Sequence, residues 1–351
     1  MDTIKGACVQ AAPVFLDLQA TLDKTGALVR EAAGKGAKLV AFPETWLPGY
    51  PWWIWLGAPI EGMAFVPRYH ANSISLGSPE MARLQEIAAD SAVTLVTGFS
   101  ERDGGSLYMS QAIIGPKGDL LLVRRKLKPT FVERAVFGEG DGSGLTVVDA
   151  PFGRLGALNC WEHLLPLVKM ALYAQGEEVH VASWPSFCLY RDVAYAFGPE
   201  VNNGASMLYA VEGGCYVLAS SALISQQMID MLCDRPEKAK LLSPLTGKPG
   251  GGFSMIYGPD GRPLCSPLPE DQEGILYADL DSAHIAIAKS AADPVGHYSR
   301  PDVVRLVVDK ARRKVMSVVG EDASSAAEQE IPQLEDAVLP ITGLLSIQRP
   351  F

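Results

Sequence analysis

The chain has 351 residues, of which 48% are hydrophobic and 20% are charged; this supplies apolar material for a large core and excludes a globally disordered chain. A formal net charge of −10 argues against nucleic-acid binding, because phosphate backbones require clustered Lys and Arg side chains. The first residues lack the features of a secretory signal, and no apolar stretch reaches the roughly 18 residues of a membrane helix, so a cytoplasmic protein without a membrane partner is expected.

Cysteine usage points to free thiols. The chain has six cysteines and no pair spaced as CxxC. Thiols stay unpaired in a reducing compartment, so neither a disulfide framework nor a metal site is predicted. No cofactor is predicted either, because the glycine run at residues 250–252 lacks the Lys-Ser/Thr ending of a phosphate-binding loop.

In the first half of the chain, apolar runs alternate with amphipathic segments. Residues 4–11 are typical of a strand, and apolar side chains near the 3.6 period predict a helix over residues 18–33. A buried strand is expected at residues 38–42, directly before Pro43 and Glu44. The other elements predicted in this half are a helix at 79–92 and strands at 93–99, 107–115 and 120–126.

The second half repeats this mixture. Its predicted strands lie at residues 145–149, 154–159, 179–183, 216–220, 252–257 and 274–279. Helices are predicted at 164–174 and 202–212, and a short one follows the last strand. Two halves of this kind indicate an α/β protein with two packed sheets flanked by helices, although a single doubly wound sheet fits the same pattern.

One domain is expected to span residues 1–310. Residues 311–351 are predicted to form a C-terminal tail that is flexible or takes part in assembly, because residues 320–336 are rich in Ala, Ser, Glu and Gln. The apolar run at 303–308 is interpreted as a strand that needs a partner surface.

Ionisable residues stand where predicted strands end, which is the usual place for ligands in α/β folds. Glu44 has aromatic residues on both sides, and desolvation there would raise the pKa of its carboxyl group toward that of a useful base. Cys160 lies between a strand and a helix, and a helix N-terminus lowers the pKa of a thiol. Taken singly, a surface Glu and a buried structural Cys are the commoner roles.

Other residues near these positions leave alternatives open. Lys126 and Lys128 are two apart on one predicted strand, so periodicity does not choose between them. Glu133 beside Arg134 also fits an ordinary surface pair. His163 suggests a Cys–His dyad, but a residue three positions along a starting helix more often faces packing or substrate.

Taken together, four segments resemble the nitrilase superfamily, and specifically its nitrilase branch. They are Phe42-Pro43-Glu44-Thr45-Trp46 with its continuation to Pro51, Arg124-Arg125-Lys126-Leu127-Lys128-Pro129-Thr130 with Glu133, Cys160-Trp161-Glu162-His163, and Asp293-Pro294-Val295-Gly296-His297 with its continuation to Asp302. The resemblance covers roughly residues 4–310. It departs at Phe131, where many relatives carry His.

The resemblance implies a four-layer αββα sandwich that assembles into dimers or longer spirals. It implies Glu44 as general base, Lys126 as the cation over the reacting nitrogen, Cys160 as nucleophile and Glu133 as a supporting carboxylate. Residues proposed to bind substrate are Tyr50, Trp53, Trp161 and Trp184, although core packing explains large rings equally well. The backbone N–H of Trp161 is a further candidate donor to the developing anion.

The expected activity is hydrolysis of a small-molecule nitrile to its acid and ammonia, with a preference for arylaliphatic nitriles. A thiolate supplies the nucleophile that a nitrile carbon needs, and a cation stabilises charge on nitrogen. The close alternatives are an amidase or carbamoylase of the same superfamily and an enzyme that hydrolyses cyanide. A distant alternative is an inactive scaffold that forms filaments.

Overall fold

The computed structural model describes residues 3–186, 194–242, 248–313 and 316. The chain divides into two units, Met1–Arg312 and Arg313–Phe351. The fold below is that of the first unit. The predicted tail, residues 311–351, lies for the most part outside the described residues, so its boundary and its role stay predictions.

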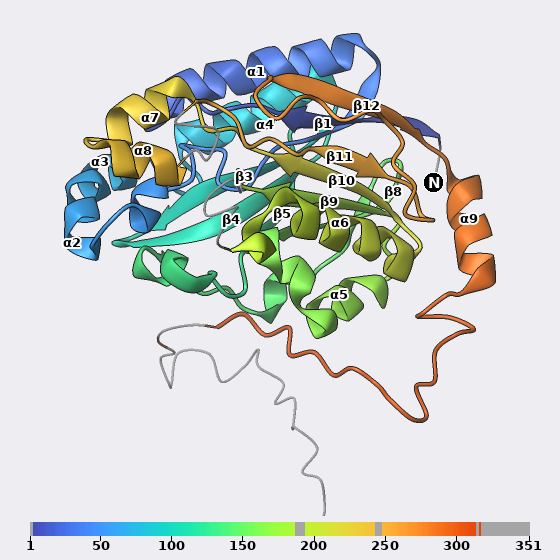
Figure 1. Ribbon diagram of the computed structural model, residues 1–351. Helices are drawn as coiled ribbons and strands as arrows, with labels where there is room; N and C mark the ends of the chain where they lie inside the picture. The colour runs from blue at the N-terminus through green and yellow to red at the C-terminus, as the bar shows by residue number, and fades with distance from the viewer. Residues whose placement is uncertain (1–2, 187–193, 243–247, 314–315, 317–351) are drawn as a thin grey trace, which may run out of the picture. The chain divides into compact units, whose positions relative to one another are not determined.

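Two sheets form the centre of the fold (Figure 1). The first has the strand order β12-β1-β2-β3-β4-β5, with β6 paired to β4, and the second has the order β11-β10-β9-β8-β7. The strands of the first sheet are β1 (Ile4–Gln10), β2 (Ala37–Ala41), β3 (Thr94–Asp103), β4 (Ser106–Ile114), β5 (Leu120–Arg125), β6 (Phe137–Gly138) and β12 (Gly274–Leu280). Those of the second are β7 (Val148–Ala150), β8 (Gly153–Asn159), β9 (Val179–Trp184), β10 (Tyr216–Ser221) and β11 (Met255–Tyr257).

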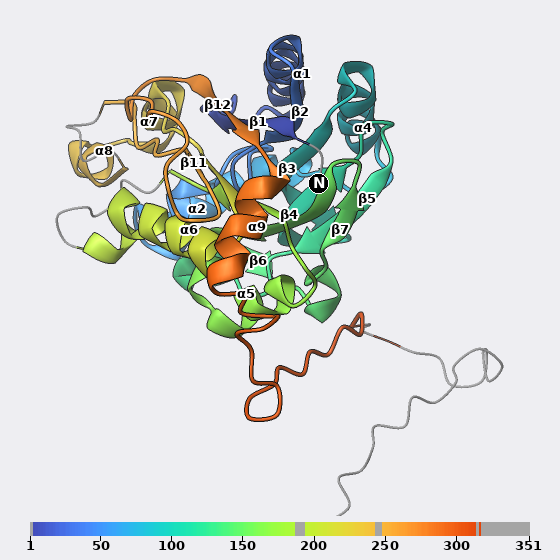
Figure 2. The ribbon, with the colours of Figure 1, turned by 90° about the vertical axis from the view of Figure 1, so that its right-hand side faces the viewer.

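Helices cover the outer faces of both sheets, as Figure 2 shows from the side. On the first sheet lie α1 (Leu18–Gly34) and α4 (Pro79–Ser91), and on the second lie α5 (Pro166–Tyr173) and α6 (Pro199–Gly213). The helix starts follow ordinary capping chemistry: the side chain of Asp17 accepts from the Ala20 N–H, and Ser78 caps α4 ahead of Pro79. A last helix, α9 (Ser282–Ala291), follows β12.

Three buried clusters separate the four layers. One packs α1 and α4 on the first sheet, and another packs α5 and α6 on the second. The middle cluster fills the space between the sheets, where Cys8, Leu39 and Val96 of one sheet meet Leu155 and Val181 of the other. Strands buried on both faces read as continuous apolar runs, which is why the central strands carry little alternation.

Short helices form a fourth cluster at one end of the sandwich. They are the 3₁₀ turns η1 (Trp52–Trp55) and η2 (Met63–Phe65) and the helices α2 (Pro59–Gly62), α3 (Val66–Ala71), α7 (Gln226–Leu232) and α8 (Pro236–Leu242). Their aromatic and aliphatic side chains pack on one another beside Phe15, Leu107 and Met109. The sequence did not predict these elements, because each is too short to show a helical period.

The prediction of two packed sheets flanked by helices is confirmed. Several boundaries were wrong. The strand predicted at 145–149 is only Val148–Ala150, and the one at 252–257 is only Met255–Tyr257. The helix predicted at 164–174 begins at Pro166, after a 3₁₀ turn, because proline favours the first helical turn. Residues 303–308 form no strand, so the interpretation of that run was also wrong.

Candidate active site

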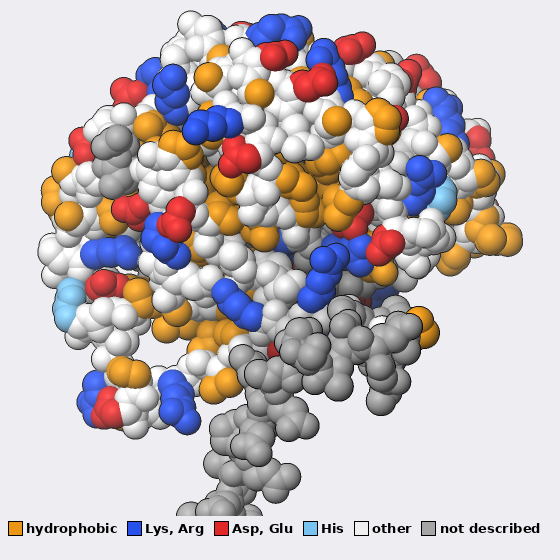
Figure 3. All heavy atoms as spheres, turned by 180° about the vertical axis from the view of Figure 1, so that it is seen from behind, with side chains coloured by type: hydrophobic (Ala, Val, Ile, Leu, Met, Phe, Trp, Pro, Cys, Tyr) orange, Lys and Arg blue, Asp and Glu red, His pale blue; other side chains and the backbone are white. Residues whose placement is uncertain are grey.

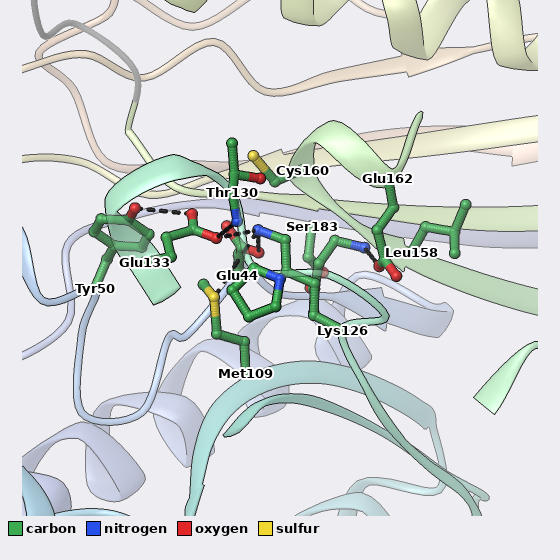
Figure 4. A network of polar contacts seen from close by, with 12 residues as sticks. Glu44, Tyr50, Met109, Lys126, Thr130, Glu133, Leu158, Cys160, Glu162 and Ser183 are labelled. Atoms are coloured by element: carbon green, nitrogen blue, oxygen red, sulfur yellow. Dashed lines mark hydrogen bonds and ion pairs between the residues drawn. The ribbon is translucent and has the colours of Figure 1, made fainter. Parts of the chain in front are cut away.

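The ends of three strands bring the candidate residues together (Figure 4). Glu44 follows β2, Lys126 directly follows β5, and Cys160 directly follows β8. Glu133 lies in the 3₁₀ turn η3 (Phe131–Ala135). The backbone N–H of Glu44 donates to the carbonyl of Trp184 at the end of β9, over 3.3 Å, so the two sheets meet at this point.

Lys126 is the centre of the site. Its ammonium group lies 2.9 Å from Glu44 Oε1 and 2.8 Å from Glu133 Oε2. All three side chains are fully buried. Burial acts to lower the pKa of Lys126, but the charges of Glu133 and Glu44 outweigh it and raise the pKa well above its usual value. The two carboxylates therefore favour the charged ammonium form of Lys126.

Glu133 is fixed by three donors. One carboxylate oxygen accepts from the hydroxyl of Tyr50 over 2.8 Å, and the other accepts from the Thr130 N–H over 2.5 Å as well as from Lys126. The indole N–H of Trp55 in turn donates to the Tyr50 hydroxyl. A buried carboxylate with this many donors is held in one orientation, so Glu133 positions the ammonium group of Lys126.

Cys160 sits on a sharp turn between β8 and the 3₁₀ turn η5 (Cys160–Leu164), with φ at +49°. Its sulfur and one oxygen each of Glu44 and Glu133 lie within 4.8 Å of one another. Burial raises the pKa of the Cys160 thiol well above its usual value, while the Lys126 cation and the Trp161 backbone N–H act in the opposite direction. The expectation of a lowered pKa was wrong, because burial outweighs these two contributions and the helix α5 begins only at Pro166.

The two carboxylate oxygens of Glu44 differ in their hydrogen bonding. Oε1 binds Lys126, and Oε2 is buried with no hydrogen-bond partner among the described residues. Burial raises the pKa of Glu44 to about 8, against the Lys126 cation and with the help of the Glu133 charge. In its ionised form this carboxylate is a stronger base than an ordinary one, so it can take a proton from a thiol or water.

Three backbone positions at the site are strained. Thr45, Phe131 and Cys160 have φ values of 47°, 48° and 49°, although none of them is glycine. Thr45 stands beside Glu44, Phe131 lies in the turn of Glu133, and Cys160 is itself a candidate site residue. Such strain costs roughly 1–3 kcal/mol per residue and persists where surrounding contacts over-determine it, commonly at active sites.

This arrangement offers a nucleophile, a base and a cation within one buried cluster. Two carboxylates and a thiolate also form a donor set for a metal ion, but here the Lys126 ammonium group is bonded to both carboxylates and supplies the positive charge. The cluster fits attack of sulfur on an electron-poor carbon whose heteroatom gains negative charge.

The structure resolves the choice between the two lysines. β5 ends at Arg125, so Lys126 and Lys128 do not share a strand face, and that interpretation was wrong. Lys128 is half exposed and pairs with Glu139 at the surface. Only Lys126 belongs to the buried cluster.

His163 does not act on the sulfur. Its Nδ1 faces the backbone carbonyl oxygen of Cys160 at 2.5 Å, and its Nε2 lies 2.9 Å from Nε2 of His180. Both ring nitrogens are thus engaged elsewhere, which excludes the Cys–His dyad.

The four residues proposed to bind substrate differ in their surroundings. The Tyr50 hydroxyl binds Glu133, and the ring of Trp161 stacks on Phe197 with centroids 4.7 Å apart. Trp53 packs among Phe15, Phe65 and Tyr69. Trp184 stacks on His163 and donates its indole N–H to Ser206. Contact with substrate stays a prediction for all four.

Sequence reasoning missed a buried ion pair, Arg124 with Glu162, beside the site. A signal was present: Glu162 stands three residues after Asn159, the spacing of a capping residue that reaches back to a backbone N–H. Arg124 lies on β5, two positions before Lys126.

Comparisons with known proteins identify the family of this chain. The family model "Carbon-nitrogen hydrolase" matches residues 5–289. The chain is 56% identical over 306 residues to a nitrilase of Pseudomonas syringae pv. syringae strain B728a, covering 87% of this chain and 90% of that protein. It is 47% identical over 338 residues to an arylacetone-specific nitrilase of Alcaligenes faecalis, covering 96% and 94%.

Among solved structures, the fold is similar to that of a carbon-nitrogen hydrolase from Helicobacter pylori G27. The TM-score is 0.65 at 19% sequence identity, and the match covers 86% of this chain and 96% of the other. At that identity the likeness concerns the fold.

Proposed function

The chain belongs to the carbon-nitrogen hydrolase family, and we propose that it hydrolyses nitriles to carboxylic acids and ammonia through covalent intermediates on Cys160. The observation that carries the proposal is the Lys126 ammonium group held between Glu44 and Glu133, with the sulfur of Cys160 beside both carboxylates. The relatives named as nitrilases support nitriles as the substrate class.

The first half of the reaction forms a thioimidate. Cys160 passes its proton to Glu44 Oε2 and its sulfur attacks the nitrile carbon. The nitrile nitrogen gains negative charge, which Lys126 and the backbone N–H of Trp161 stabilise. The proton held by Glu44 then passes to this nitrogen, which completes the thioimidate and restores the carboxylate. A preorganised cation in a site without bulk water is more effective here than solvent, because it needs no reorganisation.

The second half consumes two waters. Glu44 activates the first water to add to the thioimidate carbon, and ammonia leaves with a thioester remaining. A second water, activated by the same carboxylate, releases the carboxylic acid and returns the thiol. Glu44 accepts and returns protons in each step, which a carboxyl group with a pKa raised to about 8 can do. Glu133 stays paired to Lys126 and Tyr50 and so positions the cation.

The test is a panel of nitriles assayed for ammonia with purified protein, each beside its matching amide. We expect ammonia from nitriles and little reaction with the amides. Hydrolysis of amides at equal or greater rates would make the chain an amidase, and no turnover of any substrate would favour the inactive scaffold.

An arylaliphatic substrate is part of the proposal. Four rings run from the turn of Glu133 to the residue after Cys160: Phe131 on Trp55, Trp55 on Phe197 and Phe197 on Trp161, with centroids 5.9, 5.5 and 4.7 Å apart. Phe131 is 64% exposed. Burying a phenyl group against such rings contributes about 2–3 kcal/mol, which cyanide has no atoms to gain.

Because curated relatives include aliphatic as well as arylacetone-specific nitrilases, the panel contains phenylacetonitrile, mandelonitrile, a short alkyl nitrile and cyanide. We expect the highest kcat/KM for the two aromatic nitriles. Phe131→Leu should lower kcat/KM for these more than for the alkyl nitrile, whereas Ile60→Ala, at another exposed apolar position, should change neither. A kcat/KM for cyanide equal to that for phenylacetonitrile would place the chain among cyanide-hydrolysing enzymes.

A homo-oligomer, a dimer or a longer spiral, is also proposed. The described part of the chain leaves apolar side chains exposed on α6, where Met207, Leu208 and Val211 are 42–47% accessible. Exposed apolar groups of this kind commonly mark contact surfaces. Light scattering at micromolar concentration tests this, and a monomer would contradict it.

We propose neither a membrane nor a nucleic acid as a partner. No helix among the described residues is long and apolar enough to cross a membrane. On the face shown in Figure 3, Lys and Arg side chains are interspersed with Asp and Glu side chains, unlike the continuous basic surface that nucleic acid needs. A cytoplasmic location is proposed because the nucleophilic thiol must stay reduced, and the five cysteines among the described residues are free.

A further inference from the structure

A buried chain of hydrogen bonds runs from the nucleophile's backbone into the space between β9 and α6. It begins at the carbonyl of Cys160, 2.5 Å from His163 Nδ1, and continues from His163 Nε2 to His180 Nε2 over 2.9 Å. His180 Nδ1 lies 2.7 Å from Glu177 Oε1, and the Tyr209 hydroxyl donates to Glu177 Oε2 over 2.6 Å. The mechanism above uses none of its side chains.

Every residue in this chain of hydrogen bonds has at most 1% of its surface exposed. The His163 ring is stacked on Trp184, with centroids 5.1 Å apart, and meets Tyr209 edge-on. His180 stacks on Tyr209 at 3.9 Å. Rings packed on both sides do not rotate freely, so the hydrogen bonds hold one geometry.

A glycine on the neighbouring strand leaves room for the buried carboxyl group of Glu177. Gly156 on β8 is paired with His180 on β9. A Cβ atom at Gly156 would collide with Oε1 of Glu177. The space that Glu177 fills thus exists because β8 carries glycine at this position, three residues from the end of the strand that leads to Cys160.

The partners determine where the protons lie. A carbonyl oxygen only accepts, so His163 Nδ1 carries a proton. Burial lowers the pKa of both histidines well below their usual value, with His180 acting on His163 and Arg124 on His180, so each ring has one proton. His163 Nε2 therefore accepts from His180 Nε2–H, and His180 Nδ1 must itself accept a proton from Glu177.

Glu177 meets that requirement. Burial raises the pKa of its carboxyl group to about 8, against the hydrogen bond from Tyr209 and the charge of Lys289 on α9. A protonated Glu177 donates from one oxygen to His180 and accepts from Tyr209 at the other. All donors and acceptors along the chain are then matched.

The chain of hydrogen bonds ends at the Cys160–Trp161 peptide, whose orientation affects catalysis. In a trans peptide the carbonyl and the N–H lie in one plane and point in opposite directions. A donor that holds the carbonyl of Cys160 thereby also aims the N–H of Trp161, the backbone group that acts on the Cys160 thiol. This matters at Cys160 because its positive φ is a strained conformation.

We propose that His163 is a positioning residue, locked as the Nδ1–H tautomer by His180 and Glu177, which holds the Cys160–Trp161 peptide so that the Trp161 N–H meets the anion formed in catalysis. The proposal rests on the proposed nitrile hydrolysis and adds residues to its site. His180, Glu177 and Tyr209 act only through His163.

Two substitutions separate donation from packing. His163→Asn keeps an N–H donor at the position of Nδ1 and removes the ring, whereas His163→Phe keeps the ring and removes both nitrogens. With phenylacetonitrile we expect the Phe variant to lose about 10- to 100-fold in kcat with KM changed by less than about threefold, the signature of a lost transition-state donor. The Asn variant should retain at least about tenfold more kcat than the Phe variant.

The opposite order, with Phe active and Asn impaired, would overturn the proposal, because it would show that the ring matters only for packing. Equal kcat values for the two variants would overturn it as well. If the Phe variant does not fold, Glu177→Gln and Glu177→Leu replace it in the comparison. Gln can donate to His180 Nδ1 and Leu cannot, so equal kcat for these two variants would contradict the relay.

A readout that does not depend on activity comes from neutron diffraction on crystals of the wild-type protein. We expect protons on His163 Nδ1, His180 Nε2 and the Glu177 carboxyl group. A proton on His163 Nε2 in place of Nδ1 would overturn the proposal even if nitriles are hydrolysed. Failure of the wild-type protein to hydrolyse any nitrile would instead contradict the proposed function, and the proton positions would still decide the tautomer.

Discussion

Arg124 and Glu162 form a buried, bidentate ion pair that joins the end of β5 to the turn η5, which begins at Cys160. Arg124 Nη1 and Nη2 donate to the two carboxylate oxygens over 2.8 and 2.6 Å. The same carboxylate accepts from the backbone N–H of Leu127, one residue after Lys126, and from that of Asn159, one residue before Cys160. One side chain thus fixes the spacing between the cation and the sulfur.

Glu162→Gln should damage both stability and activity. Removing one charge leaves the Arg124 guanidinium buried without its partner, which typically costs about 3–5 kcal/mol of unfolding free energy. Urea unfolding measures this loss, and kcat with phenylacetonitrile should fall as well. Asp302→Asn, in the exposed pair with Arg300, serves as the control and should leave the unfolding midpoint unchanged. Equal effects of the two substitutions would show that the buried pair has no special role.

Cys160→Ala should abolish hydrolysis and leave the fold intact. Alanine suits the small buried site, and the thiol is the strong nucleophile of the cluster. Ammonia release measures activity, and circular dichroism checks the fold. Activity within about tenfold of wild type, a barrier change of only about 1.4 kcal/mol, would rule out Cys160 as the nucleophile.

Lys126→Ala should be far more damaging than Lys128→Ala. Loss of the buried cation removes stabilisation of the charged nitrogen and leaves Glu44 and Glu133 facing each other, so kcat should fall by at least about 10²- to 10³-fold. Lys128 makes only a surface pair with Glu139, and its removal should change kcat by less than about twofold. Steady-state kinetics decide the matter, and similar losses at both positions would refute the assignment.

The pH dependence of kcat/KM should report Glu44. Catalysis needs its ionised form, so kcat/KM for a neutral nitrile should rise with pH through about 8. In Glu133→Gln the rise should move to lower pH, because the Glu133 charge helps to raise the pKa of Glu44. A kcat/KM that stays constant from about pH 6 to about pH 9, a range that spans a pKa of about 8, would exclude Glu44 as the base.

The same raised pKa affects stability. The folded state keeps a proton on Glu44 between the unfolded pKa of 4.5 and about 8, and so binds more protons than the unfolded chain in that window. Its contribution to the free energy of unfolding is therefore largest below the lower value and falls as pH rises through the window. Glu44→Gln should weaken this fall in urea unfolding measured across these pH values; an unchanged slope would contradict the assignment.

Gly98→Ala tests the close approach behind Glu44. A Cβ atom there would lie 2.5 Å from the Pro43 carbonyl oxygen, 2.6 Å from the Thr45 nitrogen and 2.9 Å from the Glu44 Cα. The chain around Glu44 must shift to admit it, so kcat should fall by about 10²-fold, the effect of a misplacement near 1 Å. Gly105→Ala, with open space around it, is the control. Unchanged kinetics in Gly98→Ala would show that Glu44 tolerates displacement.

Much of the fold could be predicted from the sequence, because its information is local. Continuous apolar runs predicted the central strands, and a 3.6-residue period predicted α1 to within one residue. The short helices between Trp52 and Ala71 and between Gln226 and Leu242 carry no period of their own. Packing on one another stabilises them, and a single-residue pattern does not contain that information.

The sequence also predicted part of the candidate site. The ends of predicted strands drew attention to Glu44 and Cys160, and the motif resemblance then selected Lys126 and Glu133. These residue types indicated thiol chemistry assisted by a cation. Their roles remain to be tested by the substitutions above.

Only the tertiary structure decided which groups surround these residues. The ion pair of Arg124 with Glu162 joins residues 38 positions apart, and the hydrogen bond of His163 with His180 joins residues 17 positions apart. Even the pKa of Cys160 was misjudged, because it depends on burial and on charges brought from other strands. Hydrogen bonds and charges act through space over a few ångströms, so their partners are fixed by the packing of the two sheets and not by neighbours in the chain.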